Sequence, residues 1–481
     1  MKEILKDGVM PIGAYCSPQP ATSKDGGYKS RITAEQYRRM ADCGVNIVYF
    51  HNEIFGTETE NDAFKALDCA AGAGIQCFVR DALAGEYVAL PDEKSGARGY
   101  TNLTESEKAE LDERFEKSLR RYCRHSAFGG ISFWDEPGYD SFDGIAAAKK
   151  VFERVCPNKI FYVNHFPYYI TPEQYQFGYW SNRKKGECTI GQFLVEEGKR
   201  NIDRYDYLYK GFIDKVKPEM FSYDAYPFLT LGSAKTGVHE VLWELPQYLH
   251  GMEEKTGIPF WAFLQAGGQW EGNTAVRLPT EGECRLGVSV PLLYGAKGLQ
   301  IFPYAYPNDW LEDHTAEAGM VDRYGEKTRW YGWYKSIFKH VKAMESRLMR
   351  AKLKAVVKIG RYENSLPPKE ELDKILWSEC IFRGELPACE SIEKYLPQGV
   401  LRGAEADTQC LIGCMEKENR ELFFAVNDSS VVQASLKLVF GEKAVFTVIR
   451  NGETKEERID GWSGILLPGE CVLLEKNEKG N

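Results

Sequence analysis

Short apolar runs alternate with longer amphipathic stretches over roughly the first 350 residues of the chain. Runs of seven to ten residues rich in Ile, Val and Phe are typical of buried strands. Eight such runs occur, at residues 10–16, 44–53, 74–81, 129–136, 159–166, 220–228, 258–265 and 297–304. Because the intervening stretches have helical character, the pattern predicts a parallel sheet covered by helices.

The amphipathic stretches carry helix signals at their ends. The first begins with Thr33 and closes with Gly44, which predicts a helix with a cap at each end. Further helices are predicted at 104–125, 141–157, 239–257, 280–298 and 328–352. Eight strands with helices between them fit a (β/α)8 TIM barrel, which we place at residues 1–353. A doubly wound sheet is the alternative, but it would prefer a glycine-rich first turn, and "GAYCSPQP" is not one.

The pattern of apolar and polar residues changes after residue 353. Residues 354–400 are mixed and Pro-rich, and we interpret them as a connecting region. Residues 401–481 alternate apolar and polar positions between Asn-Gly and Pro-Gly turns, which predicts an antiparallel β-sandwich. Three roles stay open for this domain: completing the barrel wall, joining two copies in a homo-oligomer, or binding polysaccharide.

Composition excludes several classes of partner. The net charge of −9 argues against nucleic acid, and no apolar run approaches the roughly 18 residues needed to span a membrane. The N-terminus lacks the apolar segment of a signal peptide, although a chain whose leader had been removed would look the same. The odd number of 13 cysteines indicates reduced thiols. We therefore expect a cytoplasmic protein without cofactor or metal.

Polar residues follow most of the predicted strands. Catalytic groups of a TIM barrel lie at the C-terminal ends of its strands, so these side chains would converge on one mouth. Any single carboxylate there could simply cap the next helix, but together the set could bind sugar hydroxyls. The residues we predict to bind substrate are Glu53, Asp81, Asn164, His165, Tyr223, Tyr226, Gln265, Trp270 and Tyr304.

The segment "GGISFWDEPG" ends an apolar run on two adjacent acids, Asp135 and Glu136. Each negative charge raises the pKa of the other carboxyl, and a partly desolvated position adds to that effect. Glycoside hydrolysis uses two carboxyl groups, one of which stays protonated near neutral pH. We predict a carbohydrate substrate, with Glu136 as general acid.

The order of these motifs resembles the barrel glycoside hydrolases called clan A, over residues 10 to about 350. In that clan the acid/base Glu ends strand four, which implies this role for Glu136, and the nucleophile Glu ends strand seven. The stretch "PFWAFLQAGGQW" looks like strand seven of family 42 β-galactosidases, but Leu264 stands where the Glu is expected. "FWDEPG" resembles family 20 and family 123 hexosaminidases, whose Glu is the acid and whose Asp orients the substrate's 2-acetamido group.

Three mechanisms remain open at this point. In the first, Asp224 of "SYDAYPF" is the second carboxylate, as nucleophile or as base. In the second, Asp135 orients an acetamido group, and Tyr223 or Tyr226 steadies the sugar ring. In the third, Glu271 reaches the site from the loop after strand seven. A function of a different class is a catalytically silent barrel that only binds carbohydrate.

Overall fold

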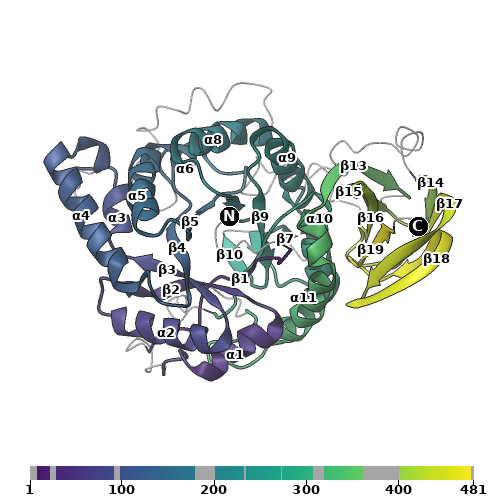
Figure 1. Ribbon diagram of the computed structural model, residues 1–481, viewed down its shortest axis with the longest axis horizontal. Coiled ribbons are helices and arrows are strands. Elements are labelled where there is room, and N and C mark those ends of the chain that lie inside the picture. The colour runs from purple at the N-terminus through teal and green to yellow at the C-terminus, as the bar shows by residue number, and fades with distance from the viewer. Residues whose placement is uncertain are drawn as a thin grey trace.

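The computed structural model describes residues 8–21, 29–91, 98–178, 201–231, 235–271, 274–306, 319–360 and 400–477. Its largest part is a closed barrel of eight parallel strands ringed by helices, and an antiparallel sheet stands beside it (Figure 1). The predicted fold class, a (β/α)8 TIM barrel with a C-terminal β-sandwich, is confirmed.

Each barrel strand overlaps one of the eight predicted apolar runs. Neighbours pair in the order β1-β12-β9-β6-β5-β4-β3-β2, and β2 closes onto β1. The strands are β1 (Ile12–Ala14), β2 (Ile47–Phe55), β3 (Gln76–Asp81), β4 (Phe128–Asp135), β5 (Ile160–His165), β6 (Phe221–Tyr223), β9 (Phe260–Gln265) and β12 (Leu299–Phe302).

Helices cover the outside of the barrel, and several carry the caps that the sequence predicts. The Thr33 side chain accepts a hydrogen bond from the N–H of Gln36, and Gly44 ends the same helix at φ 103°. The described helices are α1 (Ala34–Cys43), α2 (Glu60–Ala73), α3 (Ala84–Val88), α4 (Glu105–Tyr122), α5 (Phe142–Val155), α6 (Pro172–Phe177), α8 (Asn201–Val216), α9 (Val241–Thr256), α10 (Glu281–Leu293) and α11 (Arg329–Leu348), with short 3₁₀ turns at Tyr100–Asn102 and Tyr139–Ser141.

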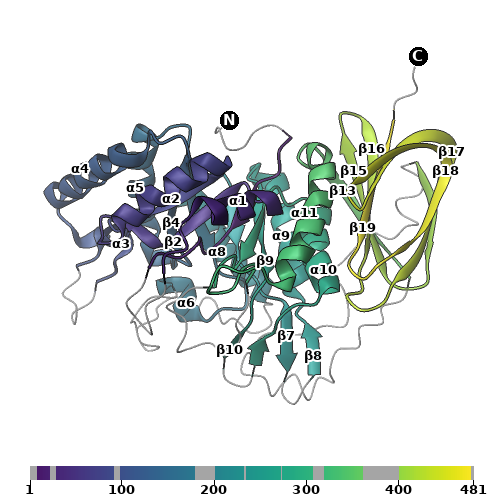
Figure 2. The ribbon, with the colours of Figure 1, turned by 90° about the horizontal axis from the view of Figure 1, so that it is seen from below.

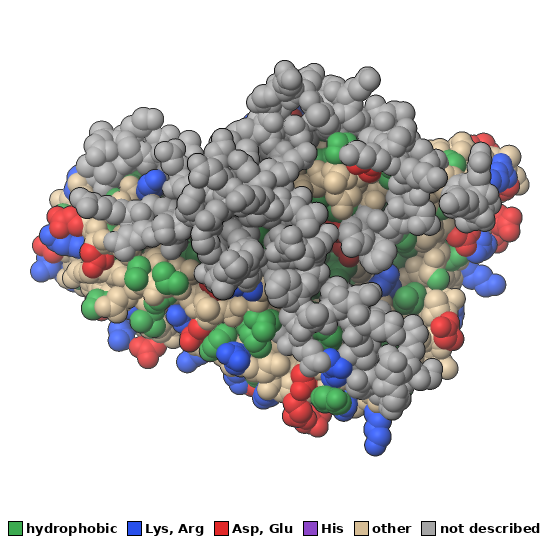
Figure 3. Space-filling view, turned by 180° about the vertical axis from the view of Figure 1, so that it is seen from behind, with side chains coloured by type: hydrophobic (Ala, Val, Ile, Leu, Met, Phe, Trp, Pro, Cys, Tyr) green, Lys and Arg blue, Asp and Glu red, His purple; other side chains and the backbone are tan. Residues whose placement is uncertain are grey.

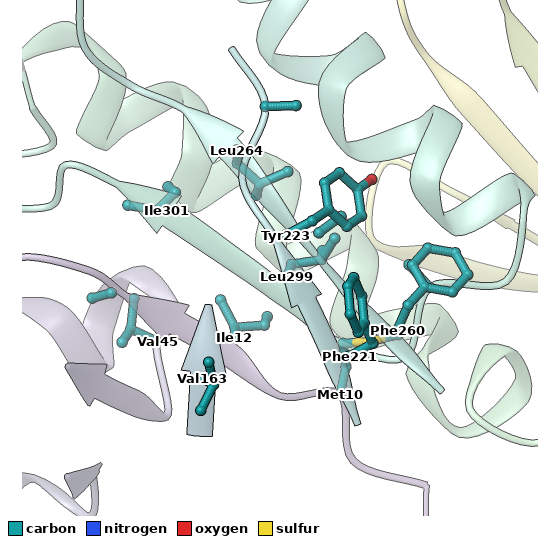
Figure 4. Packing of buried hydrophobic residues seen from close by; sticks show 14 of the residues in the cluster. Met10, Ile12, Val45, Val163, Phe221, Tyr223, Phe260, Leu264, Leu299 and Ile301 are labelled. Carbon is teal, nitrogen blue, oxygen red and sulfur yellow. The ribbon is translucent and has the colours of Figure 1, made fainter. Parts of the chain in front are cut away.

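The interior of the barrel is filled by aromatic side chains. The ring of Tyr49 lies 5.1 Å from Phe78 and 4.7 Å from Tyr162, centroid to centroid. Glycine makes room for this bulk: a Cβ on Gly298 would stand 2.5 Å from the indole of Trp261. The other face of the strands packs under the helices, and Figure 4 shows part of this apolar layer.

A small antiparallel sheet rises from the loops that follow β6 and β9, and the sequence did not predict it. Its strands are β7 (Phe228–Leu231), β8 (Lys235–Val238), β10 (Gln269–Glu271) and β11 (Thr274–Val276), in the order β10-β11-β7-β8. Figure 2 shows β7, β8 and β10 projecting beyond one end of the barrel. Because these loops leave the C-terminal ends of their strands, the small sheet borders the barrel mouth.

The C-terminal sheet encloses a second core. Its strands are β13 (Lys352–Ile359), β14 (Leu401–Ala406), β15 (Cys410–Lys417), β16 (Arg420–Asn427), β17 (Ala434–Arg450), β18 (Glu453–Leu466) and β19 (Cys471–Lys476). The long strand β17 pairs with β14, β18 and β19, so the sheet folds over an apolar cluster on its inner face. Its outer face packs on α10 and α11 (Figure 1). Strand β13 already belongs to this sheet, and residues 361–399 of the proposed connecting region lie outside the described residues.

The surface gives two further facts. Acidic and basic side chains are interspersed over the described part of the face in Figure 3, with no basic patch on it. Among the described helices, none combines the length and the apolar character that crossing a bilayer requires.

Candidate active site

Strand β4 ends at the two acids that the sequence singled out. Asp135 is its last residue, and Glu136 follows with φ 50°, in the left-handed region that costs a non-glycine residue about 1–2 kcal/mol. The N–H of Glu136 donates to the carbonyl oxygen of Asn164 on β5 at 2.9 Å, which fixes the turn. Such backbone strain is concentrated at functional sites in proteins.

A third acid comes from the next strand but one. Asp224 follows β6 directly, and its N–H donates to the carbonyl oxygen of His165 at 3.0 Å. Its side chain is 8% exposed and lies within hydrogen-bonding reach of Glu136. The barrel therefore brings Asp135, Glu136 and Asp224 together at one point of its mouth.

The surroundings of Glu136 all favour its protonated form. Burial raises the pKa of Glu136 well above its usual value, and the charges of Asp224 and Asp135 raise it further. Burial and then the charge of Asp135 also raise the pKa of Asp224 well above its usual value, while hydrogen bonds with Asn164 and Glu136 act in the opposite direction. Of the two, only Glu136 has no lowering influence on its pKa.

Asp135 differs from Glu136 because it is surrounded by donors. Burial raises its pKa, but the hydrogen bond from Asn164, the charge of Arg80 and the hydrogen bond from Tyr15 lower it. The Nδ2 of Asn164 lies 3.0 Å from Oδ1 of Asp135. The pKa of both adjacent carboxyl groups is raised, but donors oppose the rise at Asp135, whereas acidic neighbours add to it at Glu136.

Aromatic side chains surround the three acids. Burial and then the charges of Asp224, Asp135 and Glu136 raise the pKa of Tyr226, whose ring lies 5.2 Å from that of Phe302. The ring of Tyr15 lies 5.4 Å from that of Phe263 on β9. Flat apolar rings beside carboxyl groups form a surface suited to the apolar faces of a sugar.

Five predicted residues meet in the mouth: Asp135, Glu136, Asn164, Asp224 and Tyr226. Tyr15 belongs with them, although it is not among the residues predicted from the sequence. It is the residue after β1, and an alternating count along that short strand would have placed it on the same side as Gly13, whose missing Cβ leaves room for the ring of Tyr49.

Two predicted acids point elsewhere. Glu53 accepts a hydrogen bond from the hydroxyl of Ser17 and one at 3.1 Å from the N–H of Asn52, and burial raises its pKa to about 7. Asp81 accepts hydrogen bonds from Ser118 at 2.6 Å and Tyr122 at 2.8 Å, both on α4. These carboxyl groups hold parts of the barrel together.

Side chains alternate along a strand, so two further predicted residues, His165 and Tyr223, face the helices and not the mouth. His165 follows the inward-facing Asn164, so its ring turns outward and stacks on Phe221 at 4.6 Å. Burial lowers its pKa to about 3, and neither ring nitrogen has a partner among the described residues. Tyr223 likewise precedes the inward-facing Asp224 and lies in the apolar layer (Figure 4).

The remaining predicted residues are Gln265, Trp270 and Tyr304. Gln265 bonds the N–H of Phe228 at 3.1 Å and the carbonyl of Arg277 at 2.5 Å, so it ties together the two loops of the small sheet. Tyr304 is fully buried near α1 and α11. The side chains of Trp270 and Glu271 lie outside the described residues.

Strand seven of the barrel, β9, brings no carboxylate to the mouth. Leu264 is 1% exposed and packs in the apolar layer under the helices, and its neighbour Phe263 contacts Tyr15. Within the described ranges, no group of three or more His, Cys, Asp or Glu side chains could hold a metal ion.

Comparison with known proteins gives similarity in fold. Neither a protein-family model nor a curated sequence matches the chain. A GH30 endoxylanase from Clostridium papyrosolvens is 10% identical, with 98% of this chain and 97% of that one covered and a TM-score of 0.42. An Anoxybacillus alpha-amylase is 9% identical, with 98% and 99% covered and a TM-score of 0.46. A structure described as a glycoside hydrolase is 9% identical, with 98% and 94% covered and a TM-score of 0.49.

Proposed function

We propose that this protein is a glycoside hydrolase that cleaves an O-glycosidic bond of an oligosaccharide or glycoconjugate, with Glu136 as general acid. The observation that carries the proposal is the cluster of the buried Glu136 with Asp135 and Asp224 at the mouth of a TIM barrel, where burial and the two neighbouring charges raise the pKa of Glu136 well above its usual value. A carboxylic acid held neutral near pH 7 can protonate the departing oxygen of a sugar.

The contact between Glu136 and Asp224 bears on the mechanism. Two carboxyl groups that act from opposite sides of a bond stand about 5–5.5 Å apart in retaining enzymes and about 6.5–9.5 Å apart in inverting ones. A hydrogen-bonded pair is closer than either arrangement, so Asp224 serves Glu136 as its proton partner. We propose that Asp135 instead orients a 2-acetamido group of the substrate, whose oxygen attacks the anomeric carbon, while Tyr226 steadies the ring.

The test is hydrolysis of a panel of nitrophenyl glycosides, each with and without a 2-acetamido group. We expect release of nitrophenol from acetamido sugars, and a loss of about 10²–10⁴ in kcat/KM in Glu136→Gln. Asp428→Asn is the matched control, because Asp428 is also a buried carboxyl of raised pKa but lies between Trp243 and Gln409, at the junction with the β-sandwich. It should keep full activity.

Each other outcome has a definite meaning. Equal cleavage of sugars with and without the acetamido group would refute substrate assistance and the role proposed for Asp135. A wild-type protein that is inert on the whole panel, yet is retained on a sugar affinity gel, would show the catalytically silent binding barrel instead.

A further inference from the structure

A line of polar side chains crosses the otherwise aromatic interior beneath the three acids. Tyr162 and Asn164 come from β5, Ser222 from β6 and Gln300 from β12, and none is more than 1% exposed. Their neighbours in the interior include Phe78 and Trp261. Burying four polar groups among such rings is unfavourable unless each finds a partner.

The partners form a chain with one direction. The Tyr162 hydroxyl donates to Oε1 of Gln300 at 2.6 Å, and Nε2 of Gln300 donates to the Ser222 hydroxyl at 2.8 Å. Ser222 donates to Oδ1 of Asn164 at 2.9 Å, and Nδ2 of Asn164 donates to Asp135 at 3.0 Å. We call these four residues, Tyr162, Gln300, Ser222 and Asn164, the interior relay.

The direction follows from the chemistry of the groups. An amide nitrogen only donates, so Ser222 accepts from Gln300 and gives its own proton to Oδ1 of Asn164. The Tyr162 hydroxyl also lies 2.9 Å from the Ser222 hydroxyl, and its proton goes to Gln300. With the oxygen of the Asn164 amide held by Ser222, its nitrogen faces Asp135, whereas a reversed amide would place its oxygen against that carboxylate.

Through Asn164, the interior relay contacts two of the three acids. Asn164 lies within hydrogen-bonding reach of Asp135 and of Asp224, while the influences on Glu136 are burial and its two acidic neighbours. The other charged or titratable groups that face Asp135 are Tyr15 after β1, His51 on β2, Arg80 on β3, the adjacent Glu136, and Asp224 and Tyr226 after β6.

We propose that the interior relay is a positioning device that fixes the amide of Asn164 with its nitrogen toward Asp135, where the hydrogen bond favours the ionised form of that carboxyl group. Its consequence for catalysis rests on the proposed hydrolase function, but its effect on Asp135 does not. Tyr162, Gln300 and Ser222 are positioning residues, since they act on the mouth only through Asn164.

The experiment titrates the acids without substrate. Protein labelled with 13C at its Asp and Glu carboxyl carbons is followed by NMR against pH, and Asp135→Asn assigns the signal of Asp135. In Ser222→Ala we expect the signal of Asp135 to titrate about one pH unit higher, because the hydrogen bond from Asn164 to the carboxylate of Asp135 is weakened. Ser222→Thr, which retains the hydroxyl, should restore the wild-type value.

The matched control is Ser289→Ala, which removes a buried hydroxyl that donates to Gly469 at 2.9 Å, away from the mouth. It should leave the titration of Asp135 unchanged. An unshifted signal in Ser222→Ala, or an equal shift in Ser289→Ala, overturns the relay. If Ser222→Ala does not fold, Tyr162→Phe replaces it, with a smaller upward shift expected and no shift overturning the proposal.

Activity then separates the two proposals. With a nitrophenyl glycoside that the protein cleaves, the acidic limb of the plot of kcat/KM against pH should shift to higher pH in Ser222→Ala, together with the NMR signal of Asp135. A shifted signal in a protein that cleaves no glycoside supports the relay and refutes the hydrolase function. Cleavage with neither limb nor signal displaced supports the hydrolase and refutes the relay.

Discussion

Asp428 lies at the junction of the barrel and the β-sandwich and should make the stability of the protein depend on pH. It is fully buried and accepts hydrogen bonds from Trp243 of α9 at 2.8 Å and from Gln409 at 2.5 Å. Burial nevertheless raises its pKa to about 7, whereas an exposed Asp titrates near 3.9. Between these pH values the folded chain holds a proton that the unfolded chain has lost.

The sign of the effect follows from that difference in bound protons. The contribution of Asp428 is fully present below about pH 4 and is lost as pH rises through 7. With a slope of about 1.4 kcal/mol per pH unit that flattens near pH 7, the loss from pH 5 to 7.5 is about 2.5 kcal/mol. For a chain of 481 residues, this is a fall of about 2–3 °C in Tm.

The assay is thermal unfolding of the wild type and of Asp428→Asn from pH 5 to 7.5. An Asn keeps the bond from Trp243, and Oε1 of Gln409, which has no partner among the described residues, can accept from its amide after a flip. Other groups such as Glu53 titrate alike in both proteins and cancel in the difference. The difference in stability should therefore change by about 2.5 kcal/mol across this range. Parallel curves for the two proteins would refute the reasoning.

Two further predictions concern packing. His165→Phe should leave kcat/KM unchanged and keep or raise Tm, because the imidazole ring is buried, neutral and packed among Phe side chains. A loss of activity of tenfold or more would instead place His165 at the active site. Gly298→Ala should destabilise the barrel by about 1–3 kcal/mol, because the new Cβ would stand 2.5 Å from the rigid indole of Trp261. Denaturant unfolding measures the change in stability, and an unchanged unfolding midpoint would contradict the prediction.

The sequence predicts single residues of the site but not the contacts between them. The run that ends in Asp135 and Glu136 could be found by reading the chain, and so could Asp224, because each follows a strand-like segment directly. Their contact could not be found, since it needs β4 and β6 to lie on either side of β5 in a closed barrel. Alternation along β1 could have placed Tyr15 beside Gly13, but its contact with Asp135, 120 residues away in the chain, exists only in the folded barrel.

Periodicity alone determined the eight strands, most of the helices and the β-sandwich, because side chains two or about 3.6 positions apart share a face whatever the rest of the chain does. It did not determine which face of a strand turns inward at its last residue. Only the barrel decided that Asn164 and Asp224 face the mouth while His165 and Tyr223 face the helices, since one residue of register reverses every side chain. Tertiary structure also raised the pKa of the acids, because burial and neighbouring charge exist only once the strands have closed.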